Sequence, residues 1–206
     1  MSFNPDETSS FVVHLPAEDL EATKIGPWIR RSTSVPYVNP WIQIEHHEVT
    51  DPSGKAGIYG VVRFKHFALG CVPLHDDGTV TLVGQHRYPL DVWSWEIPSG
   101  GGRKDREILP EMMRELKEET GLDGTEWIEL GSLQTSNSVT DEKAFIWLVR
   151  GLREGSNQPE STEGDLEVKR VPFAEAVEMA YNGQLTDAIS VAGLLRAARW
   201  LEKHPK

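Results

Sequence analysis

Apolar and polar positions alternate along several short stretches of the chain, and this pattern predicts β-strands. Ile42 to Val49 alternate in this way and Asp51-Pro-Ser-Gly follows as a turn, so residues 37–65 are predicted to form hairpin strands. Further apolar runs predict strands at residues 67–73, 79–85, 127–133, 144–149 and 166–171. Residues 1–27 are polar with little periodicity, and we expect a loosely ordered arm there.

Apolar residues spaced three and four positions apart predict helices. The clearest stripe consists of Leu109, Met112, Met113 and Leu116. Pro110 suits a first helical turn, where its missing N–H costs little, and Gly121 supplies a helix stop. Two later stripes predict helices over residues 173–182 and 189–204. Strands around one early helix, with two helices near the C-terminus, predict a mixed α/β fold.

Composition excludes some classes of function. The chain has 206 residues and a formal net charge of −11, which argues against a nucleic-acid partner because phosphate binding needs basic patches. Cys71 is the only cysteine, which rules out an internal disulfide, and its apolar neighbours predict a buried thiol. Without a secretory signal or a membrane-length apolar run, we expect a cytoplasmic protein with no membrane partner.

Three carboxylates of the early helix form a candidate metal site. Glu118 and Glu119 follow Glu115 by three and four residues, so the three side chains share one helical face. Like charges at this spacing repel, whereas Mg²⁺ or Mn²⁺ binds hard oxygen ligands of this kind. The glycines at 100–102 allow close approach of the backbone, and Arg114 can hold one carboxylate by a bidentate pair. The alternative is an ordinary solvated helix face.

Residues 100–122 resemble the Nudix box, whose pattern is Gly, five residues, Glu, seven residues, then Arg-Glu-apolar-any-Glu-Glu-any-Gly-apolar. The positions in register are Gly100, Arg114, Glu115, Leu116, Glu118, Glu119, Gly121 and Leu122. One position departs, because the first Glu of the pattern is Arg106 here and Glu107 is displaced by one. We expect Arg106 to weaken cation binding if its charge points into the site, and Glu107 to compensate if the loop shifts.

The resemblance extends beyond the box. Residues 85–89, 95–98 and 183–191 are similar to the ADP-ribose pyrophosphatase branch of the family. This resemblance implies an α/β/α sandwich around a mixed sheet, with an N-terminal β-strand extension. It also implies a Nudix hydrolase domain over residues 66–206, preceded by an arm and strands over residues 1–65 that pack on a second subunit in a homodimer.

The same resemblance implies roles for the metal-site residues. Glu115 and Glu119 would be direct ligands, and the Ser99 carbonyl would be a backbone ligand. Glu118 would be a ligand through water or a partner of the attacking water. For Glu96 two roles stay open, because it can join the metal shell or tie the glycine loop.

Other residues would bind substrate or move protons. Arg87 would hold a phosphate oxygen, with a surface salt bridge as the alternative. The candidates for the general base are Glu163, Glu160 and Glu142, each of which lies in a polar loop. Trp28 and Trp41 would stack on the nucleobase, or would only pack in the core or the dimer.

The function implied is metal-dependent hydrolysis of the diphosphate of a nucleoside diphosphate-sugar. ADP-ribose is the first candidate, with AMP and ribose 5-phosphate as products. One alternative is another sugar nucleotide, such as GDP-mannose or a UDP-sugar. The other is a Nudix-fold binding or regulatory module with little turnover, motivated by Arg106.

Overall fold

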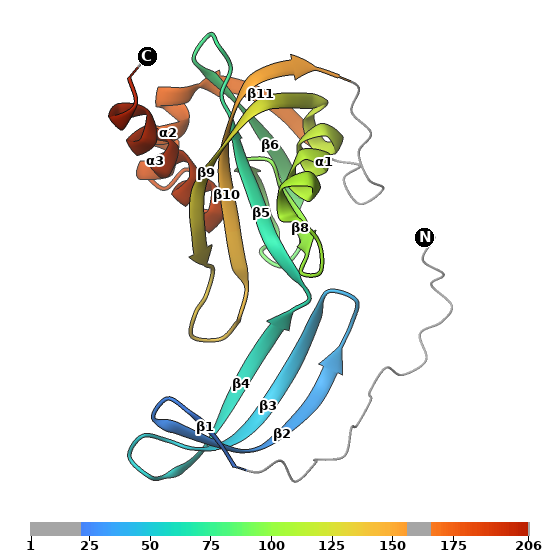
Figure 1. The fold of residues 1–206 in the computed structure, drawn as a ribbon, viewed down its shortest axis with the longest axis vertical. Coiled ribbons are helices and arrows are strands. Elements are labelled where there is room, and N and C mark those ends of the chain that lie inside the picture. Colours follow the sequence, from blue (N-terminus) through green and yellow to red (C-terminus); the bar gives the residue numbers. More distant parts are fainter. Residues whose placement is uncertain (1–21, 156–165, 206) are drawn as a thin grey trace, which may run out of the picture. The chain divides into compact units, whose positions relative to one another are not determined.

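A computed structural model describes residues 22–155 and 166–205 of the chain (Figure 1). The chain divides into two compact units. The first unit comprises residues 1–65 together with 136–142, and the second comprises residues 66–135 and 143–206. A short segment between two strands of the second unit thus belongs to the first.

The first unit is built on a four-stranded antiparallel sheet in the order β1-β2-β3-β4. Its strands are β1 (Thr23–Ile25), β2 (Trp28–Val38), β3 (Ile42–Thr50) and β4 (Ala56–Phe64). The β3–β4 hairpin is confirmed, and its turn is held by a hydrogen bond from the Ser53 N–H to Asp51 Oδ1 at 2.8 Å. The expected arm is wrong at its end, because β1 lies inside it. Strand β2 was also missed, since its partly buried residues show no regular alternation.

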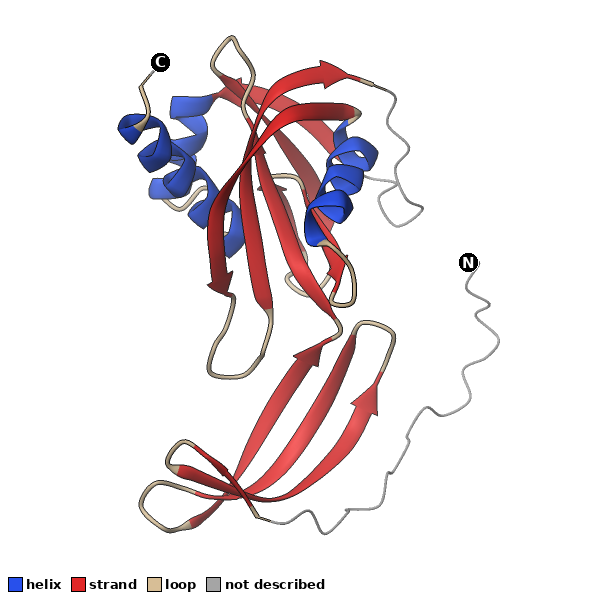
Figure 2. Ribbon diagram, in the orientation of Figure 1, coloured by secondary structure: helices blue, strands red, loops and turns tan. Residues whose placement is uncertain are grey.

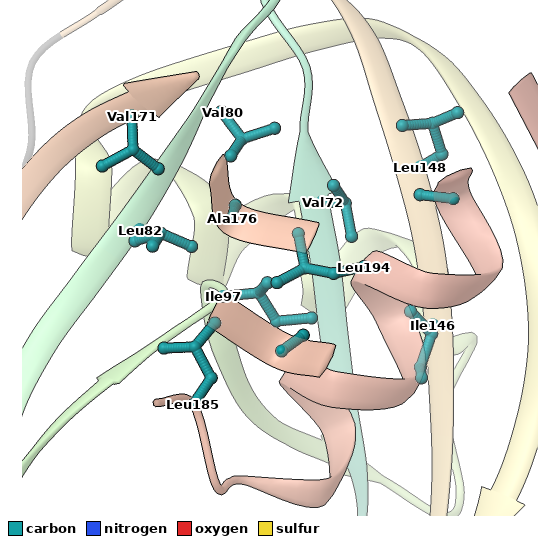
Figure 3. Close-up of a cluster of buried hydrophobic side chains, with 12 residues drawn as sticks. Val72, Val80, Leu82, Ile97, Ile146, Leu148, Val171, Ala176, Leu185 and Leu194 are labelled. Atoms are coloured by element: carbon teal, nitrogen blue, oxygen red, sulfur yellow. The ribbon is translucent and has the colours of Figure 1, made fainter. Parts of the chain in front are cut away.

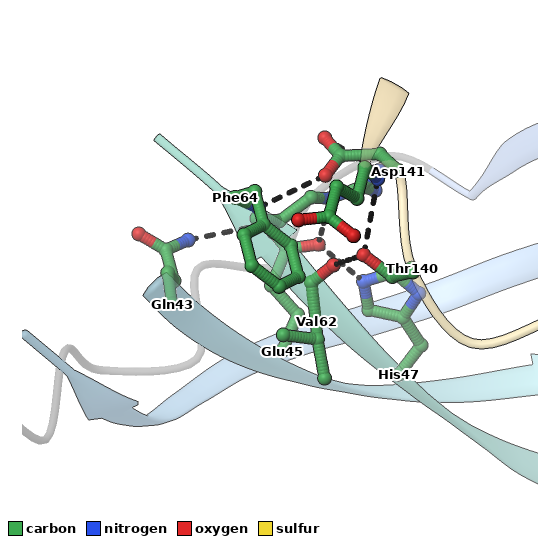
Figure 4. Close-up of polar contacts among 9 residues, drawn as sticks. Gln43, Glu45, His47, Val62, Phe64, Thr140 and Asp141 are labelled. Carbon is green, nitrogen blue, oxygen red and sulfur yellow. Dashed lines mark hydrogen bonds and ion pairs between the residues drawn. The ribbon is translucent and has the colours of Figure 1, made fainter. Parts of the chain in front are cut away.

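The segment 136–142 is fastened to β4 by backbone and side-chain hydrogen bonds (Figure 4). The Val62 N–H donates to the Val139 carbonyl at 2.9 Å, and the Phe64 N–H donates to Asp141 Oδ1 at 3.0 Å. Thr140 Oγ1 donates to the Val62 carbonyl at 2.9 Å. These bonds extend the first unit beyond its four strands.

The second unit contains two sheets flanked by helices (Figure 2). One sheet has the order β8-β5-β10-β9 and is mixed, because β5 and β10 are parallel while the other pairs are antiparallel. Its strands are β5 (His66–Pro73), β8 (Ser99–Arg103), β9 (Leu122–Gln134) and β10 (Lys143–Glu154). The other sheet, in the order β11-β6-β7, consists of β6 (Thr79–Arg87), β7 (Val92–Glu96) and β11 (Glu167–Pro172).

Helix α1 lies on one face of the mixed sheet, whereas α2 and α3 lie on the other (Figure 1). Their bounds are α1 (Ile108–Thr120), α2 (Phe173–Tyr181) and α3 (Ala188–Lys203). This arrangement confirms the predicted α/β/α sandwich with an N-terminal strand extension. None of the described helices is long and apolar enough to cross a membrane.

Alternate residues of the central strands supply two separate cores. In β10, Ile146 and Leu148 face the α2–α3 side, where they join residues such as Leu194 (Figure 3). Trp147 and Val149 face the α1 side. Both faces are buried, and such strands carry nearly continuous apolar runs. The predicted strands at 67–73 and 144–149 are such runs.

Two expectations near α1 were wrong in detail. The glycines at 100–102 are not a loop but part of strand β8, which pairs with β5. Glycine-rich strands lack the side-chain alternation by which strands are recognised. Met113 does not belong to the buried stripe, because it is 38% exposed. Cys71 is buried as predicted.

Candidate active site

Helix α1 brings glutamates to the edge of its buried face. Met112 and Leu116 are fully buried beneath the helix, and Glu115 and Glu119 are only 8% and 1% exposed. Glu118 is more open, with 24% of its side chain exposed. Buried carboxylates are costly unless they are hydrogen-bonded, ion-paired or bound to a cation. Glu115 and Glu119 therefore do not lie on an ordinary solvated helix face.

The bounds of α1 follow from the residues at its ends. The helix begins after Glu107, whose backbone is extended and whose side chain makes no capping hydrogen bond. It ends at Gly121, whose φ of 72° is left-handed and whose N–H donates to the Lys117 carbonyl at 2.9 Å. Glycine adopts this conformation without steric cost. The stop places Glu119 in the last turn, directly before β9.

Strand β8 approaches α1 closely because its glycines carry no side chains. A Cβ on Gly100 would lie 2.3 Å from Cδ of Glu115, so any other residue would displace that carboxylate. The Ser99 N–H donates to Glu119 Oε2 at 3.0 Å. The backbone of β8 therefore contacts both buried carboxylates, and Ser99 lies beside Glu119.

Arg114 is surrounded by carboxylates of its own helix. Its guanidinium group donates to Glu115 Oε1 at 2.5 Å and to Glu118 Oε2, and Glu111 Oε2 lies 3.7 Å from Nη2. Burial alone would lower the pKa of Arg114, but the charges of Glu115, Glu118 and Glu111 outweigh it and raise that pKa. Arg114 thus separates carboxylates that would otherwise repel one another.

Arg87 and Glu96 form a bidentate pair between the neighbouring strands β6 and β7. Arg87 Nε donates to Glu96 Oε1 at 2.8 Å, and Nη2 donates to Oε2. Burial would raise the pKa of Glu96, but the hydrogen bonds and charge of Arg87 hold it below its ordinary value. The bonds to Glu96 raise the pKa of Arg87 despite burial, and the charges of Asp187 and Glu119 act in the same direction. Glu96 is therefore placed to orient Arg87.

The donor chemistry of α1 and β8 suits a hard divalent cation. Glu115 and Glu119 offer carboxylate oxygens beside the backbone of Ser99 and Gly100, and oxygen ligands are those that Mg²⁺ and Mn²⁺ prefer. Within residues 22–155 and 166–205, no group of three or more His, Cys, Asp or Glu side chains is arranged to hold a metal ion. Arg114 and the Ser99 N–H instead bind the carboxylates that a cation would use.

The first unit contains a pocket of about 320 Å³. Trp28 and Tyr59 form one corner of it, with ring centroids 5.5 Å apart and ring planes at 85°. Arg30 and Arg63 also line the pocket, and Arg63 Nε donates to Glu45 Oε2 at 3.1 Å. Aromatic rings and planar guanidinium groups can both stack against a flat ring.

Comparison with known proteins identifies the family of this chain. The family model of the NUDIX domain matches residues 64–191, which is more than half of the chain. The chain belongs to the Nudix family. It is a pyrophosphohydrolase similar to ADP-ribose pyrophosphatases.

Two relatives carry the name ADP-ribose pyrophosphatase. One, from Mycobacterium tuberculosis (strain ATCC 25618 / H37Rv), is 32% identical over 158 residues, which cover 74% of this chain and 74% of the relative. The other, from Bacillus subtilis (strain 168), is 28% identical over 148 residues, covering 71% and 80%. A solved structure described as an ADP compounds hydrolase has a TM-score of 0.78 at 18% identity, covering 89% of this chain and 99% of that one, and supports the fold.

The other residues named from the sequence either fall outside the described residues or belong to the first unit. Glu160 and Glu163 fall outside the described residues. Glu142 belongs to the first unit, where its N–H donates to Thr140 Oγ1 at 3.1 Å. Trp41 is 62% exposed and is not among the residues that line the Trp28 pocket.

Sequence analysis missed three residues that the structure makes prominent. Tyr59 was overlooked, although the alternation Gly57, Tyr59, Val61, Arg63 places it on one face of β4. Arg30, two residues after Trp28 in β2, lines the same pocket and was not singled out. Glu111 was overlooked because it lies outside the Nudix pattern, yet it contacts the arginine that the pattern specifies.

Proposed function

We propose that this Nudix enzyme hydrolyses the diphosphate of a nucleoside diphosphate-sugar, with ADP-ribose as the first candidate. The observation that carries the proposal is the pair of buried carboxylates, Glu115 and Glu119, held against the β8 backbone at Gly100 and Ser99. The names of the two relatives support the choice of ADP-ribose. The products would be AMP and ribose 5-phosphate.

Glu115, Glu119 and the Ser99 carbonyl are the groups that we assign to binding Mg²⁺ or Mn²⁺. When bound, such an ion neutralises the diphosphate and lowers the pKa of a bound water. Glu118 would hold that water in place or bind the ion through water. Glu96 is engaged by Arg87, so we assign it to positioning rather than to the metal shell.

Arg87 is the residue that we assign to gripping the diphosphate. Its pair with Glu96 engages Nε and Nη2, which leaves Nη1 as the nitrogen for a phosphate oxygen. A planar guanidinium group bound through two nitrogens keeps a fixed direction, whereas the flexible ammonium group of a lysine would not. Glu96→Gln should therefore raise KM for the substrate more than it lowers turnover.

The proton of the attacking water must pass to a carboxylate. Attack forms a new bond between the water oxygen and one phosphorus, and the bond from that phosphorus to the bridging oxygen breaks. The bridging oxygen leaves with the other phosphate. Glu163, Glu160 and Glu142 are the candidates for the base, and single Gln substitutions should identify it by a loss of turnover at unchanged KM.

We assign the nucleobase to the Trp28 pocket of the first unit. The corner formed by Trp28 and Tyr59 offers ring faces for stacking, at small entropic cost. Trp41 is assigned no stacking role because it does not line this pocket. The resemblance implies that this pocket serves a homodimer with sites shared between copies.

A panel of nucleotide-sugars with Mg²⁺ or Mn²⁺ tests the proposal. Phosphatase releases phosphate from the monoester products but not from the intact diphosphate, so coupled phosphate release reports cleavage. ADP-ribose should give the highest kcat/KM, ahead of GDP-mannose and UDP-sugars. Tight binding of ADP-ribose without cleavage would instead identify a binding or regulatory module, the alternative that Arg106 motivates.

A further inference from the structure

Glu111 lies between two arginines at the start of α1. Its Oε1 is 3.6 Å from Nη1 of Arg106, and its Oε2 is 3.7 Å from Nη2 of Arg114. The Glu111 side chain is only 16% exposed, whereas the two arginine side chains are 58% and 41% exposed. Each carboxylate oxygen thus faces a different guanidinium group.

The position of Glu111 matters because Arg114 also binds groups that the proposed function requires. Arg114 donates to Glu115 and Glu118, and a cation has to compete with the guanidinium group for these carboxylates. Separating a partly buried guanidinium group from its carboxylates is unfavourable. Glu111 is a third carboxylate beside Arg114 that does not belong to the ligand set.

We propose that Glu111 is a positioning residue that retains Arg114 when Glu115 and Glu118 turn to a divalent cation. The inference rests on the proposed function of the site. Glu111 lowers the cost of releasing the Glu115 and Glu118 carboxylates from Arg114, and it acts through Arg114 without touching the cation. Glu111 therefore determines how tightly the site binds its metal.

The same contact explains how the chain accommodates Arg106. The guanidinium group of Arg106 is directed to Glu111, so the carboxylate lies between two positive groups that would otherwise repel each other. Glu107, the other candidate to compensate for Arg106, is exposed and makes no capping hydrogen bond. The compensating carboxylate is thus one turn further along the helix.

The test compares Mn²⁺ binding to the wild type, Glu111→Gln, Glu111→Asp and Glu107→Gln, measured directly by electron paramagnetic resonance of free Mn²⁺. Glu111→Gln should weaken Mn²⁺ binding about fivefold, the scale expected of a partly exposed ion pair. Glu111→Asp should weaken it similarly, because the shorter side chain keeps the charge but loses the reach. Glu107→Gln, the matched control, should bind Mn²⁺ as the wild type does.

Each contrary result overturns the inference. If Glu111→Asp binds like the wild type, the charge acts only at long range and the contact is irrelevant. If Glu111→Gln binds like the wild type, or Glu107→Gln is equally impaired, Glu111 has no special role. Thermal unfolding is measured in parallel, and a lower melting temperature with unchanged Mn²⁺ affinity means a purely structural role. A wild type that binds Mn²⁺ but cleaves no nucleotide-sugar refutes the proposed function and leaves this inference standing.

Discussion

Gly100 and Glu115 are packed so closely that no β-carbon fits between them. A Cβ on Gly100 would lie 2.3 Å from Cδ of Glu115, far inside van der Waals contact. The carboxylate and the strand backbone therefore occupy positions that only glycine permits. The β8 backbone thus meets a carboxylate that we assign to the metal.

Gly100→Ala should lower kcat/KM by about a hundredfold, because displacing a catalytic group by about 1 Å has costs of this size. Gly101→Ala is the matched control, since its Cβ would meet His66 Cβ at an ordinary 3.8 Å. Steady-state kinetics on both variants, with circular dichroism to verify folding, checks the prediction. Equal activity of the two variants would show that the position of Glu115 does not limit the reaction.

Glu119→Gln should lower turnover by orders of magnitude while the fold stays intact. The amide oxygen of glutamine can still accept the Ser99 N–H, so this bond can be kept while the negative charge is lost. Glu178→Gln, at an exposed position of α2, is the control for a charge change alone. Turnover is measured with saturating ADP-ribose and Mg²⁺. Near wild-type rates in Glu119→Gln would end the metal-carboxylate mechanism.

Cys71 should resist thiol reagents in the native protein. Burial raises the pKa of its thiol well above the usual value, and the charge of Glu119 acts in the same direction. Because the thiolate is the reactive form, labelling at pH 8 should be slow before unfolding and should reach one thiol per chain after it. Rapid stoichiometric labelling of folded protein, measured by mass spectrometry, would contradict the buried position.

His75 should make the folded state less stable as the pH falls. Burial and then the charge of Arg170 lower its pKa in the folded state, so the unfolded chain binds a proton more readily. Stability should therefore decline from about pH 6.5, the ordinary histidine pKa, downward through the lowered pKa of the folded state. Urea unfolding of His75→Gln between pH 7 and 5 should show a shallower decline, with His46→Gln, a histidine of the first unit, as control.

If sites are shared between two copies, mixing two inactive variants should restore activity. Trp28→Ala lacks the proposed base-stacking side chain and Glu119→Gln lacks a proposed metal ligand, so each homodimer is impaired at both sites. A mixed dimer contains one intact site, and equal mixing with exchange should give about a quarter of wild-type activity. Mixtures no more active than their components, or light scattering that shows a monomer, would exclude shared sites.

The helix and its carboxylates were predictable because their determinants are local in sequence. Pro110 and Gly121 delimit the helix, and spacings of three and four residues place Glu115 and Glu119 together. Burial of these two glutamates could not be predicted in the same way. It depends on β8, whose glycines conceal a strand from any analysis of alternation.

Contacts between segments that are distant in the sequence could not be predicted from it. Trp28 meets Tyr59 only because β3 lies between their strands and aligns them. Glu111 and Arg106 are five residues apart across the start of α1, which is not a spacing that regular helix geometry brings together. The bidentate partner of Arg87 likewise depends on the register of β6 and β7.

The fastening of segment 136–142 to β4 means that the N-terminal sheet is not a detachable module. The chain passes between the two units at residues 65–66, 135–136 and 142–143. Removing residues 1–65 would therefore leave segment 136–142 in the chain without the strand that it binds. Val139 and Asp141 would then lose the backbone groups of Val62 and Phe64. To make the second unit independent, a tight hairpin turn would have to join Gln134 to Lys143. These two residues already pair across β9 and β10.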